Sequence, residues 1–164
     1  MKSLRSVTLW PAWLALLTLA VATPAPSYAQ AATRGATRDL GADEALGGHT
    51  LARHVGKTDA QLAARLKSEP QISAASTYTD RAIAERSVGA ALAAGGRQLS
   101  SWEKRTGRRP NLVLHYVAPS GQPLGRSLSR GRAKPVPASR ALVVLRWDER
   151  SARFYVLTSY PEAE

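Results

Sequence analysis

The sequence predicts a single α+β domain, with helices in its first part and antiparallel strands in its second part. Two observations support this prediction. Before Gly107, apolar residues recur at helical spacing between capping signals, whereas after it they alternate with polar residues. Near the end of the chain, two alternating segments are separated by a short polar turn, which is typical of a β-hairpin.

Four helices are predicted, and capping residues mark the start of the last three. The first helix is expected around residues 44–55, interrupted by two glycines. A capping box, Thr58-x-x-Gln61, begins the second helix, Thr79 or Asp80 caps the third, and another capping box, Ser100-x-x-Glu103, begins the fourth. The apolar positions expected to be buried are Leu62, Leu66, Ala84, Val88, Ala91 and Leu92.

Three strands are predicted at residues 111–117, 140–147 and 152–160, and the last two form the hairpin. Residues 125–139 are rich in Gly, Ser, Arg and Pro, and they are interpreted as a long basic loop. No internal repeat is found.

In the last predicted strand, Thr158 and Tyr160 lie two positions apart and therefore share a face. We expect this face to continue the core-facing line of Phe154 and Val156. A buried hydroxyl and a buried phenol require polar partners.

The N-terminus has the features of a secretory signal peptide. Lys2 and Arg5 precede an apolar stretch, and Ser27 and Ala29 place small residues at the −3 and −1 positions of a cleavage site. The stretch is shorter than the roughly 20 residues needed to span a bilayer. We therefore expect residues 1–29 to be cleaved, leaving a periplasmic or secreted protein without a membrane anchor.

After the predicted cleavage, residues 30–43 are interpreted as a flexible leader and residues 44–164 as the folded domain. The mature chain would keep 21 basic and 12 acidic side chains, a formal net charge of +9. Seventeen of the basic residues are arginines, whose planar guanidinium donates two parallel hydrogen bonds to a phosphate. This charge favours a polyanionic partner such as nucleic acid, an anionic membrane surface or an acidic polysaccharide.

Several kinds of chemistry are excluded or disfavoured by the residues present. The chain has no cysteine, which excludes disulfides, thiolate catalysis and cysteine-bound metals. Gly56-Lys57-Thr58 is not a phosphate-binding loop, because Leu51 occupies the position of the required first glycine. On a helix, His49 and His54 would point about 140° apart, a poor arrangement for one metal ion. No metal site and no cofactor is predicted, and His115 is expected to be packed or half-buried in its strand.

A series of short motifs runs in order through residues 47–161. They are His49-Thr-Leu-Ala-Arg-His54-Val-Gly-Lys-Thr58, Leu62, Arg65-Leu66, Ala75-Ser-Thr77-Tyr-Thr, Trp102 and Phe154-Tyr-Val-Leu-Thr158-Ser-Tyr160-Pro161. Together they resemble the bacterial RNase A-like domain found at the C-termini of contact-dependent growth inhibition toxins. The resemblance implies an RNase A-like fold without disulfides, which agrees with the absence of cysteine.

The resemblance implies an active site made of His54, Arg65, Thr158 and Tyr160, and a metal-independent endoribonuclease toxin. Such an enzyme cuts RNA by attack of the 2′-hydroxyl on the adjacent phosphorus, giving a 2′,3′-cyclic phosphate and a 5′-hydroxyl. His54 would act as base or acid, and Arg65 would bind the non-bridging oxygens. Thr158 and Tyr160 would bond to the phosphate, or Tyr160 would protonate the leaving group. The residue that carries out the second proton transfer is not identified. His49 is a candidate, although we expect it to have a structural role.

The expected partner is RNA, bound by a monomer. Basic residues expected to hold the strand are Lys57, Arg126, Arg130 and Arg132. The resemblance also implies a cognate immunity protein, for which an acidic surface would suit this charge. Two alternative functions remain: a non-catalytic basic domain that binds nucleic acid or cell-envelope polyanions, and a secreted domain that chiefly binds a partner protein.

Overall fold

The computed structural model describes residues 37–163. The predicted signal peptide and residues 30–36 of the predicted leader lie outside the described residues. The helices are α2 (Leu40–Ala45), α3 (Thr50–His54), α4 (Asp59–Ser68), α5 (Arg81–Ala94), α6 (Gly96–Glu103) and the short 3₁₀ helix η1 (Pro119–Gly121). The strands are β1 (Ala74–Tyr78), β2 (Leu112–Val117), β3 (Gly125–Ser129), β4 (Val136–Ala138), β5 (Arg140–Asp148) and β6 (Arg153–Glu162).

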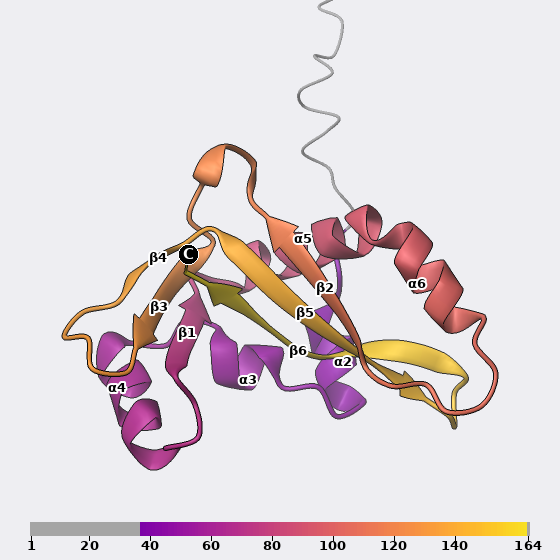
Figure 1. The fold of residues 1–164 in the computed structure, drawn as a ribbon, viewed down its shortest axis with the longest axis horizontal. Helices are drawn as coiled ribbons and strands as arrows, with labels where there is room; N and C mark the ends of the chain where they lie inside the picture. The colour runs from indigo at the N-terminus through magenta and orange to yellow at the C-terminus, as the bar shows by residue number, and fades with distance from the viewer. Residues whose placement is uncertain (1–36, 164) are drawn as a thin grey trace, which may run out of the picture.

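Two three-stranded antiparallel sheets carry these helices, in the orders β1-β3-β4 and β2-β5-β6. Figure 1 shows α4 beside β1 and β3 at one end of the molecule, and α5 and α6 beside β2 toward the other. The predicted α+β class is therefore confirmed. One strand departs from the predicted order of helices first and strands second, because β1 lies between α4 and α5 in the chain.

Helix α2 begins inside the segment that was predicted to be a flexible leader. The Asp39 carboxylate accepts hydrogen bonds from the first backbone N–H groups of the helix. Leu40 is fully buried, and buried Asp43 forms an ion pair with Arg38 at 2.6 Å. Because the cap and the burial hold this segment in the fold, the predicted boundary at residue 43 is wrong, and the folded domain begins before it.

Helices α4 and α5 begin where their caps predicted. The capping box is complete, with the Thr58 hydroxyl and the Gln61 side chain each accepting the other residue's backbone N–H. Asp80 caps α5 by accepting from the N–H of Ile83. Five of the six predicted apolar positions are buried: Leu62, Leu66, Ala84, Val88 and Ala91. The sixth, Leu92, is partly buried against the core.

Helix α6 begins at Gly96, so the capping box predicted at Ser100 is wrong. Gly95 ends α5 and begins α6, with no side-chain cap at the junction. A Cβ atom on Gly95 would lie 2.7 Å from a methyl carbon of Leu114 in β2. Glycine therefore favours the close approach of the helix junction to Leu114, and Ser100 lies inside the helix.

The region predicted to be a long basic loop contains β3 and β4, and β1 was not predicted. Backbone proximity explains part of the difference. A Cβ atom on Gly125 would lie 2.0 Å from the Thr77 carbonyl oxygen, so β3 can approach β1 at this point only with glycine. In β3, Leu128 is the only large apolar side chain, and it packs with Leu62 and Leu66 of α4. Strands this poor in large apolar residues give a weak periodic signal.

The core lies between the inner face of the β2-β5-β6 sheet and the helices. Val143, Leu145 and Val156 are completely buried there together with Val88 of α5. Tyr78 of β1 extends into the same core and links the two sheets, because its hydroxyl lies 2.6 Å from the Ser159 hydroxyl of β6. In the described residues, no helix has the length and apolar character needed to cross a membrane.

Strand β6 contains a β-bulge that decides which side chains face the core. Leu145 of β5 pairs with Val156, but the preceding residue, Val144, pairs with Thr158. Leu157 is therefore the extra residue, and the alternation of side chains reverses there. Thr158 and Tyr160 do share a face, as predicted, but it is opposite to the core-facing line of Val156, so that part of the prediction is wrong.

Helix α3 is fastened to this bulge by two hydrogen bonds. The N–H of His49, the residue before the helix, donates to the Leu157 carbonyl at 3.0 Å. The N–H of Ser159 donates to the hydroxyl of Thr50 at 2.9 Å. Both bonds set α3 against the part of β6 that carries Thr158.

We predict that Thr50→Val lowers the free energy of unfolding by about 1–3 kcal/mol, because the buried N–H of Ser159 loses its acceptor while the side-chain shape is kept. Chemical denaturation measures the change. The matched control is Thr106→Val, where the same change at an exposed position should cost about 0.5 kcal/mol or less. Equal losses in the two variants would contradict the role given to Thr50.

Candidate functional site

A cleft of about 520 Å³ opens where α3 and α4 meet β1, β3 and the end of β6. All four residues of the predicted active site line it. The full lining is His49, His54, Arg65, Gln71, Ile72, Ser73, Ala74, Ser76, Ser127, Ser129, Thr158, Tyr160, Pro161, Glu162 and Ala163.

Each predicted site residue is positioned by a different part of the fold. His54 is the last residue of α3, directly before the extended residue Val55. Arg65 lies between the buried residues Leu62 and Leu66 of α4, at the border of the stripe that packs on the smaller sheet. Thr158 and Tyr160 reach the cleft because of the bulge in β6.

His54 is the centre of the site and is 5% exposed. Its Nδ1 lies 3.3 Å from the Ser76 carbonyl oxygen and 3.5 Å from Nη1 of Arg65. Its ring centroid lies 5.2 Å from that of Tyr160. A ring nitrogen cannot donate to a carbonyl and accept from a guanidinium at once. The tautomer with the proton on Nδ1 satisfies Ser76, and it leaves the lone pair of Nε2 available to accept a proton.

The surroundings of His54 keep it neutral. Burial and, next, the charge of Arg65 lower its pKa from 6.5 to about 3, against a smaller opposing effect of the Ser76 carbonyl. At neutral pH the imidazole is therefore a proton acceptor. Burial, followed by the carboxylate of Glu162, raises the pKa of Tyr160 above its ordinary value. The phenol thus keeps its proton and can donate.

Glu69 holds the arginine beside His54. Nε of Arg65 donates to the Glu69 carboxylate at 3.2 Å, one turn further along the helix. Arg53 donates to the same carboxylate at 2.7 Å. The hydrogen bond from Arg65 is the main cause of the lowered pKa of Glu69. Two arginines thus share one carboxylate at the border of the cleft, which leaves a net positive charge there.

Thr158 supplies a polar group without a partner. Its Oγ1 is buried, and it makes no hydrogen bond to any of the described residues. Buried hydroxyls are normally satisfied, and leaving one unpaired costs about 1–3 kcal/mol. An unpaired hydroxyl on the wall of a cleft can bond to a ligand that enters it.

His49, the residue directly before α3, also lines the cleft. Burial and then the charge of Arg53 lower its pKa. Its backbone N–H is bonded to the bulge in β6, which is consistent with the structural role expected of it, while its side chain remains on the cleft wall.

The four basic residues expected to hold RNA do not line this cleft. Arg126 donates to the Asp59 carboxylate at 2.6 Å and to the Lys57 carbonyl at 2.7 Å. Arg130 donates to the carbonyls of Glu69 and Ile72. These two guanidinium groups therefore connect β3 to α4 and its C-terminal loop. The other two, Lys57 and Arg132, are exposed or partly exposed elsewhere on the same end of the domain.

Sequence reasoning missed the polar residues contributed by the smaller sheet. Ser76 of β1 and Ser127 of β3 are paired directly across the strands, and Ala74 is paired with Ser129. All four face the cleft. The signal was present in the alternation of Ser127, Leu128 and Ser129, but these residues were assigned to a loop.

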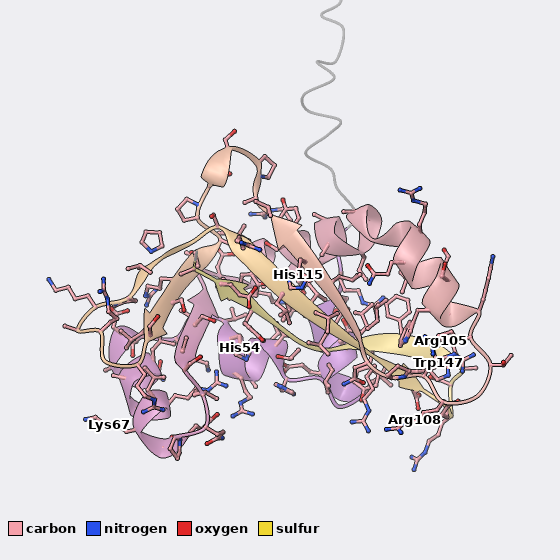
Figure 2. The ribbon with its side chains drawn as sticks, viewed as in Figure 1. His54, Lys67, Arg105, Arg108, His115 and Trp147 are labelled. Atoms are coloured by element: carbon pink, nitrogen blue, oxygen red, sulfur yellow. The ribbon has the colours of Figure 1, made fainter. Side chains whose placement is uncertain are left out.

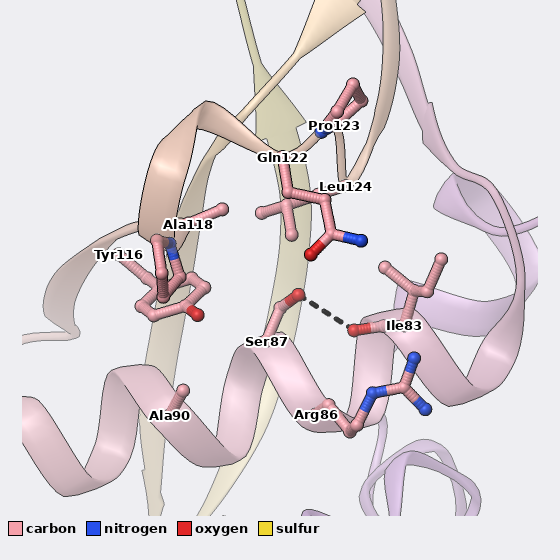
Figure 3. Close-up of a pocket in the computed structure, with 10 residues that line it drawn as sticks. Ile83, Arg86, Ser87, Ala90, Tyr116, Ala118, Gln122, Pro123 and Leu124 are labelled. Atoms are coloured by element: carbon pink, nitrogen blue, oxygen red, sulfur yellow. Dashed lines mark hydrogen bonds between the residues drawn. The ribbon is translucent and has the colours of Figure 1, made fainter. Parts of the chain in front are cut away.

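A second hollow, of about 290 Å³, lies between α5 and the segment that joins β2 to β3. Ile83, Ala90 and Leu124 contribute apolar surface to it, and Arg86 lies at its border (Figure 3). The Ser87 hydroxyl already donates to the Ile83 carbonyl at 2.8 Å. None of the predicted site residues lines this hollow.

The residues in the larger cleft suit acid–base chemistry at a phosphate. A neutral imidazole accepts a proton, a guanidinium binds anionic oxygens, and two hydroxyls donate hydrogen bonds. No group of three His, Asp or Glu side chains comes together as metal ligands among residues 37–163.

Comparisons with known proteins give a family match and a structural match. The model of the family described as "Bacterial CdiA-CT RNAse A domain" matches residues 48–161. A solved structure, the crystal structure of a CdiA-CT/CdiI complex from Y. kristensenii 33638, is similar with a TM-score of 0.62 and 29% sequence identity. The similarity covers 71% of this chain and 100% of that chain. A comparison with curated protein sequences gives no significant match.

The family match spans more than half of the chain and includes all four residues at the centre of the cleft. The similarity to that structure extends over its whole length, and this chain, which resembles it in fold, contains no cysteine. The chain therefore belongs to the family of bacterial CdiA-CT RNase A domains, the ribonuclease domains of contact-dependent growth inhibition toxins.

Proposed function

We propose that this protein is a metal-independent endoribonuclease that cuts RNA by attack of the 2′-hydroxyl on the adjacent phosphorus. The observation that carries the proposal is the contact of a neutral, buried His54 with both Arg65 and Tyr160 in one cleft. These groups match the needs of the reaction: a base, a positive charge and a proton donor.

The first step is proton removal from the 2′-hydroxyl by Nε2 of His54. The resulting oxygen bonds to phosphorus, and the bond from phosphorus to the 5′-oxygen breaks. Tyr160 gives its proton to the departing 5′-oxygen and later recovers a proton from His54. The products are a 2′,3′-cyclic phosphate and a 5′-hydroxyl, and no proton is gained or lost overall.

Arg65 and Thr158 bind the phosphate during this step. The guanidinium, held by Glu69 through its Nε, directs its remaining N–H groups toward the non-bridging oxygens. The unpaired Thr158 hydroxyl donates to one of the same oxygens. Both interactions strengthen as negative charge accumulates on the phosphorus centre, which is where electrostatic stabilisation accelerates a reaction.

A bound phosphate also changes the state of His54. In the unoccupied cleft, Arg65 disfavours the imidazolium. A phosphate that neutralises Arg65 removes part of this effect, so the pKa of His54 rises when substrate binds. The imidazole can then take up the proton that the reaction releases.

Export and an inhibitory partner complete the proposal. We propose that residues 1–29 direct the protein out of the producing cell, which separates the activity from that cell's own RNA. The similar structure contains CdiI together with CdiA-CT, and by analogy we propose an immunity protein with an acidic surface for this basic domain. Finding Met1 on the exported protein would contradict cleavage, and full activity in the presence of the protein encoded next to it would contradict that partner.

We predict that the purified protein cleaves RNA in the presence of EDTA and that His54→Ala lowers the rate at least about 100-fold, since a positioned base contributes about 10²–10⁴-fold. Gel electrophoresis of a labelled oligonucleotide measures the rate. Arg86→Ala, on the exposed side of α5, is the control that should keep activity. Single-stranded DNA should remain intact because it lacks the 2′-hydroxyl.

Intact RNA with the wild-type protein would contradict the enzymatic proposal and favour the alternative of a non-catalytic nucleic-acid binder. Cleavage that requires added magnesium would contradict the metal-independent mechanism. Efficient cleavage of DNA would contradict attack by the 2′-hydroxyl.

We predict that Thr158→Val separates stability from activity. The Thr158 hydroxyl has no partner to lose, so an isosteric apolar side chain should leave the free energy of unfolding unchanged or raise it by about 1 kcal/mol. The same change should lower kcat/KM for RNA by roughly tenfold or more, because one donor to the phosphate is lost. Thr158→Ser should keep most of the activity. A less stable Thr158→Val protein with normal kinetics would refute this role.

We predict that burial of neutral His54 makes the protein sensitive to acid. The unfolded chain takes up a proton at His54 below its ordinary pKa of 6.5, whereas the folded protein takes it up only near pH 3. The free energy of unfolding should therefore fall as pH is lowered from about 6.5 to about 3, by up to about 1.4 kcal/mol per pH unit from this group. Urea unfolding at several pH values should show a shallower fall for His54→Asn. Identical slopes for the two proteins would show that His54 is not held neutral.

A further inference from the structure

On one face of the β2-β5-β6 sheet, the part formed by β2 and β5 carries exposed side chains. This surface, called the outer face here, carries Val113, His115 and Val117 of β2 and Arg140, Leu142, Val144 and Arg146 of β5. Val113 is 40% exposed and Val117 is 60% exposed. The helix α5 packs on the opposite, inner face. A partly exposed apolar sheet face beside a cleft is a candidate binding surface.

The outer face is continuous with the cleft that contains His54. His115 is exposed, so the expectation that it would be packed or half-buried in its strand is wrong. In the sheet register, His115 is paired with Leu142, and Leu142 is paired with Tyr160. The three side chains form one row across the sheet. Because neighbouring strands lie about 4.8 Å apart, the backbone of His115 is about 10 Å from that of Tyr160. Figure 2 shows His115 on β2 and His54 on the helix below the sheet.

Beyond this face, one end of the molecule carries a group of basic side chains, called the basic end here. They come from the loop after α6 and from the β5-β6 hairpin, and they are Lys104, Arg105, Arg108, Arg146, Arg150 and Arg153. Among the described residues, none of the six forms an ion pair. In Figure 2, Arg105 and Arg108 lie beside Trp147, at the opposite end from Lys67.

The fold holds these two basic segments together. The Arg109 guanidinium lies 4.1 Å from the ring centre of Trp147 in β5, and it also donates to the Glu103 carbonyl. The carboxylates of the hairpin are already engaged. Asp148 accepts from groups of Ser151 within the turn, and Glu149 accepts from the indole N–H of Trp147 at 3.1 Å. The positive charge of this end is therefore only partly compensated.

The charges on the outer face indicate in which direction a polyanion would extend from the cleft. At one end of β5, Arg140 is paired in register with Glu162 of β6, whose carboxylate also faces the cleft. At the opposite end of β5, Arg146 belongs to the basic end. Its register partner is Tyr155, so no carboxylate is paired with it. A polyanion that leaves the cleft is attracted toward Arg146 and repelled by Glu162.

We propose that a single-stranded RNA held in the cleft continues over the outer face, with a base stacked on His115 and its phosphates bound at the basic end. This inference rests on the proposed ribonuclease function and adds the path of the substrate. Aromatic rings on a sheet combined with nearby cations are a common way to hold single strands. The predicted alternative path through Arg126 and Arg130 is weaker, because both guanidinium groups are engaged within the protein.

The test measures RNA binding in a protein that cannot cut its ligand. The full chain with His54→Ala is titrated against a fluorescein-labelled RNA of about 12 nucleotides, and anisotropy gives Kd at several salt concentrations. Adding Arg105→Ala and Arg108→Ala should weaken binding roughly tenfold at low salt and reduce the slope of log K against log salt by about 1.4, or about 0.7 for each lost phosphate contact.

The matched control removes the same charge elsewhere. Lys67→Ala with Arg86→Ala takes two exposed basic side chains from α4 and α5, and it should leave Kd and the salt slope nearly unchanged. If the two double variants lose affinity equally, only net charge matters and the proposed path is wrong. The path is also wrong if Arg105→Ala with Arg108→Ala binds as tightly as its parent.

The outer face itself is tested at His115. In the same His54→Ala background, His115→Ala should weaken binding by roughly tenfold, the usual effect of removing one stacking partner, and His115→Tyr should restore it. Unchanged binding by His115→Ala would overturn the stacking contact. Because these are binding measurements, they remain informative if the wild-type protein fails to cut RNA, an outcome that would refute the ribonuclease mechanism alone.

Discussion

The candidate site depends above all on the β-bulge at Leu157. By adding one residue to β6, the bulge leaves Val156 in the core and turns Thr158 and Tyr160 into the cleft. The carbonyl of Leu157 also accepts the hydrogen bond that begins α3. A single irregularity therefore sets the orientation of the two hydroxyl-bearing side chains and the position of the helix that carries His54. Bulges are frequent beside active sites for this reason.

The second constraint is electrostatic. His54 is buried next to Arg65, and both burial and this charge disfavour the imidazolium. The arrangement costs stability in acid, but it keeps a base ready in a cleft whose positive charge attracts phosphate. Glu69 makes the arrangement possible, because it binds Arg65 from the side away from His54. The unpaired hydroxyl of Thr158 adds a second group that is more useful to a bound phosphate than to the fold.

Much of the fold and of the site could be predicted from local signals. The capping residues Thr58 and Asp80 set the starts of α4 and α5, since a cap depends only on neighbouring backbone groups. The resemblance of short motifs was sufficient to name four residues that line one cleft. The errors occurred where a distant contact decides the structure. Gly95, the residue before α6, lies close to Leu114 of β2, and β3 forms although Leu128 is its one large apolar side chain.

By itself, the sequence determined the α+β class, the starts of α4 and α5, the excess of positive charge and four of the residues that line the cleft. Only the tertiary structure decided how those residues face one another. A register shift in β6 reversed the predicted orientation of Thr158, and Arg126 is engaged by an ion pair with Asp59 and a hydrogen bond to the Lys57 carbonyl. Both depend on contacts between segments far apart in the sequence, whereas caps and periodicity report only on neighbours within a few residues.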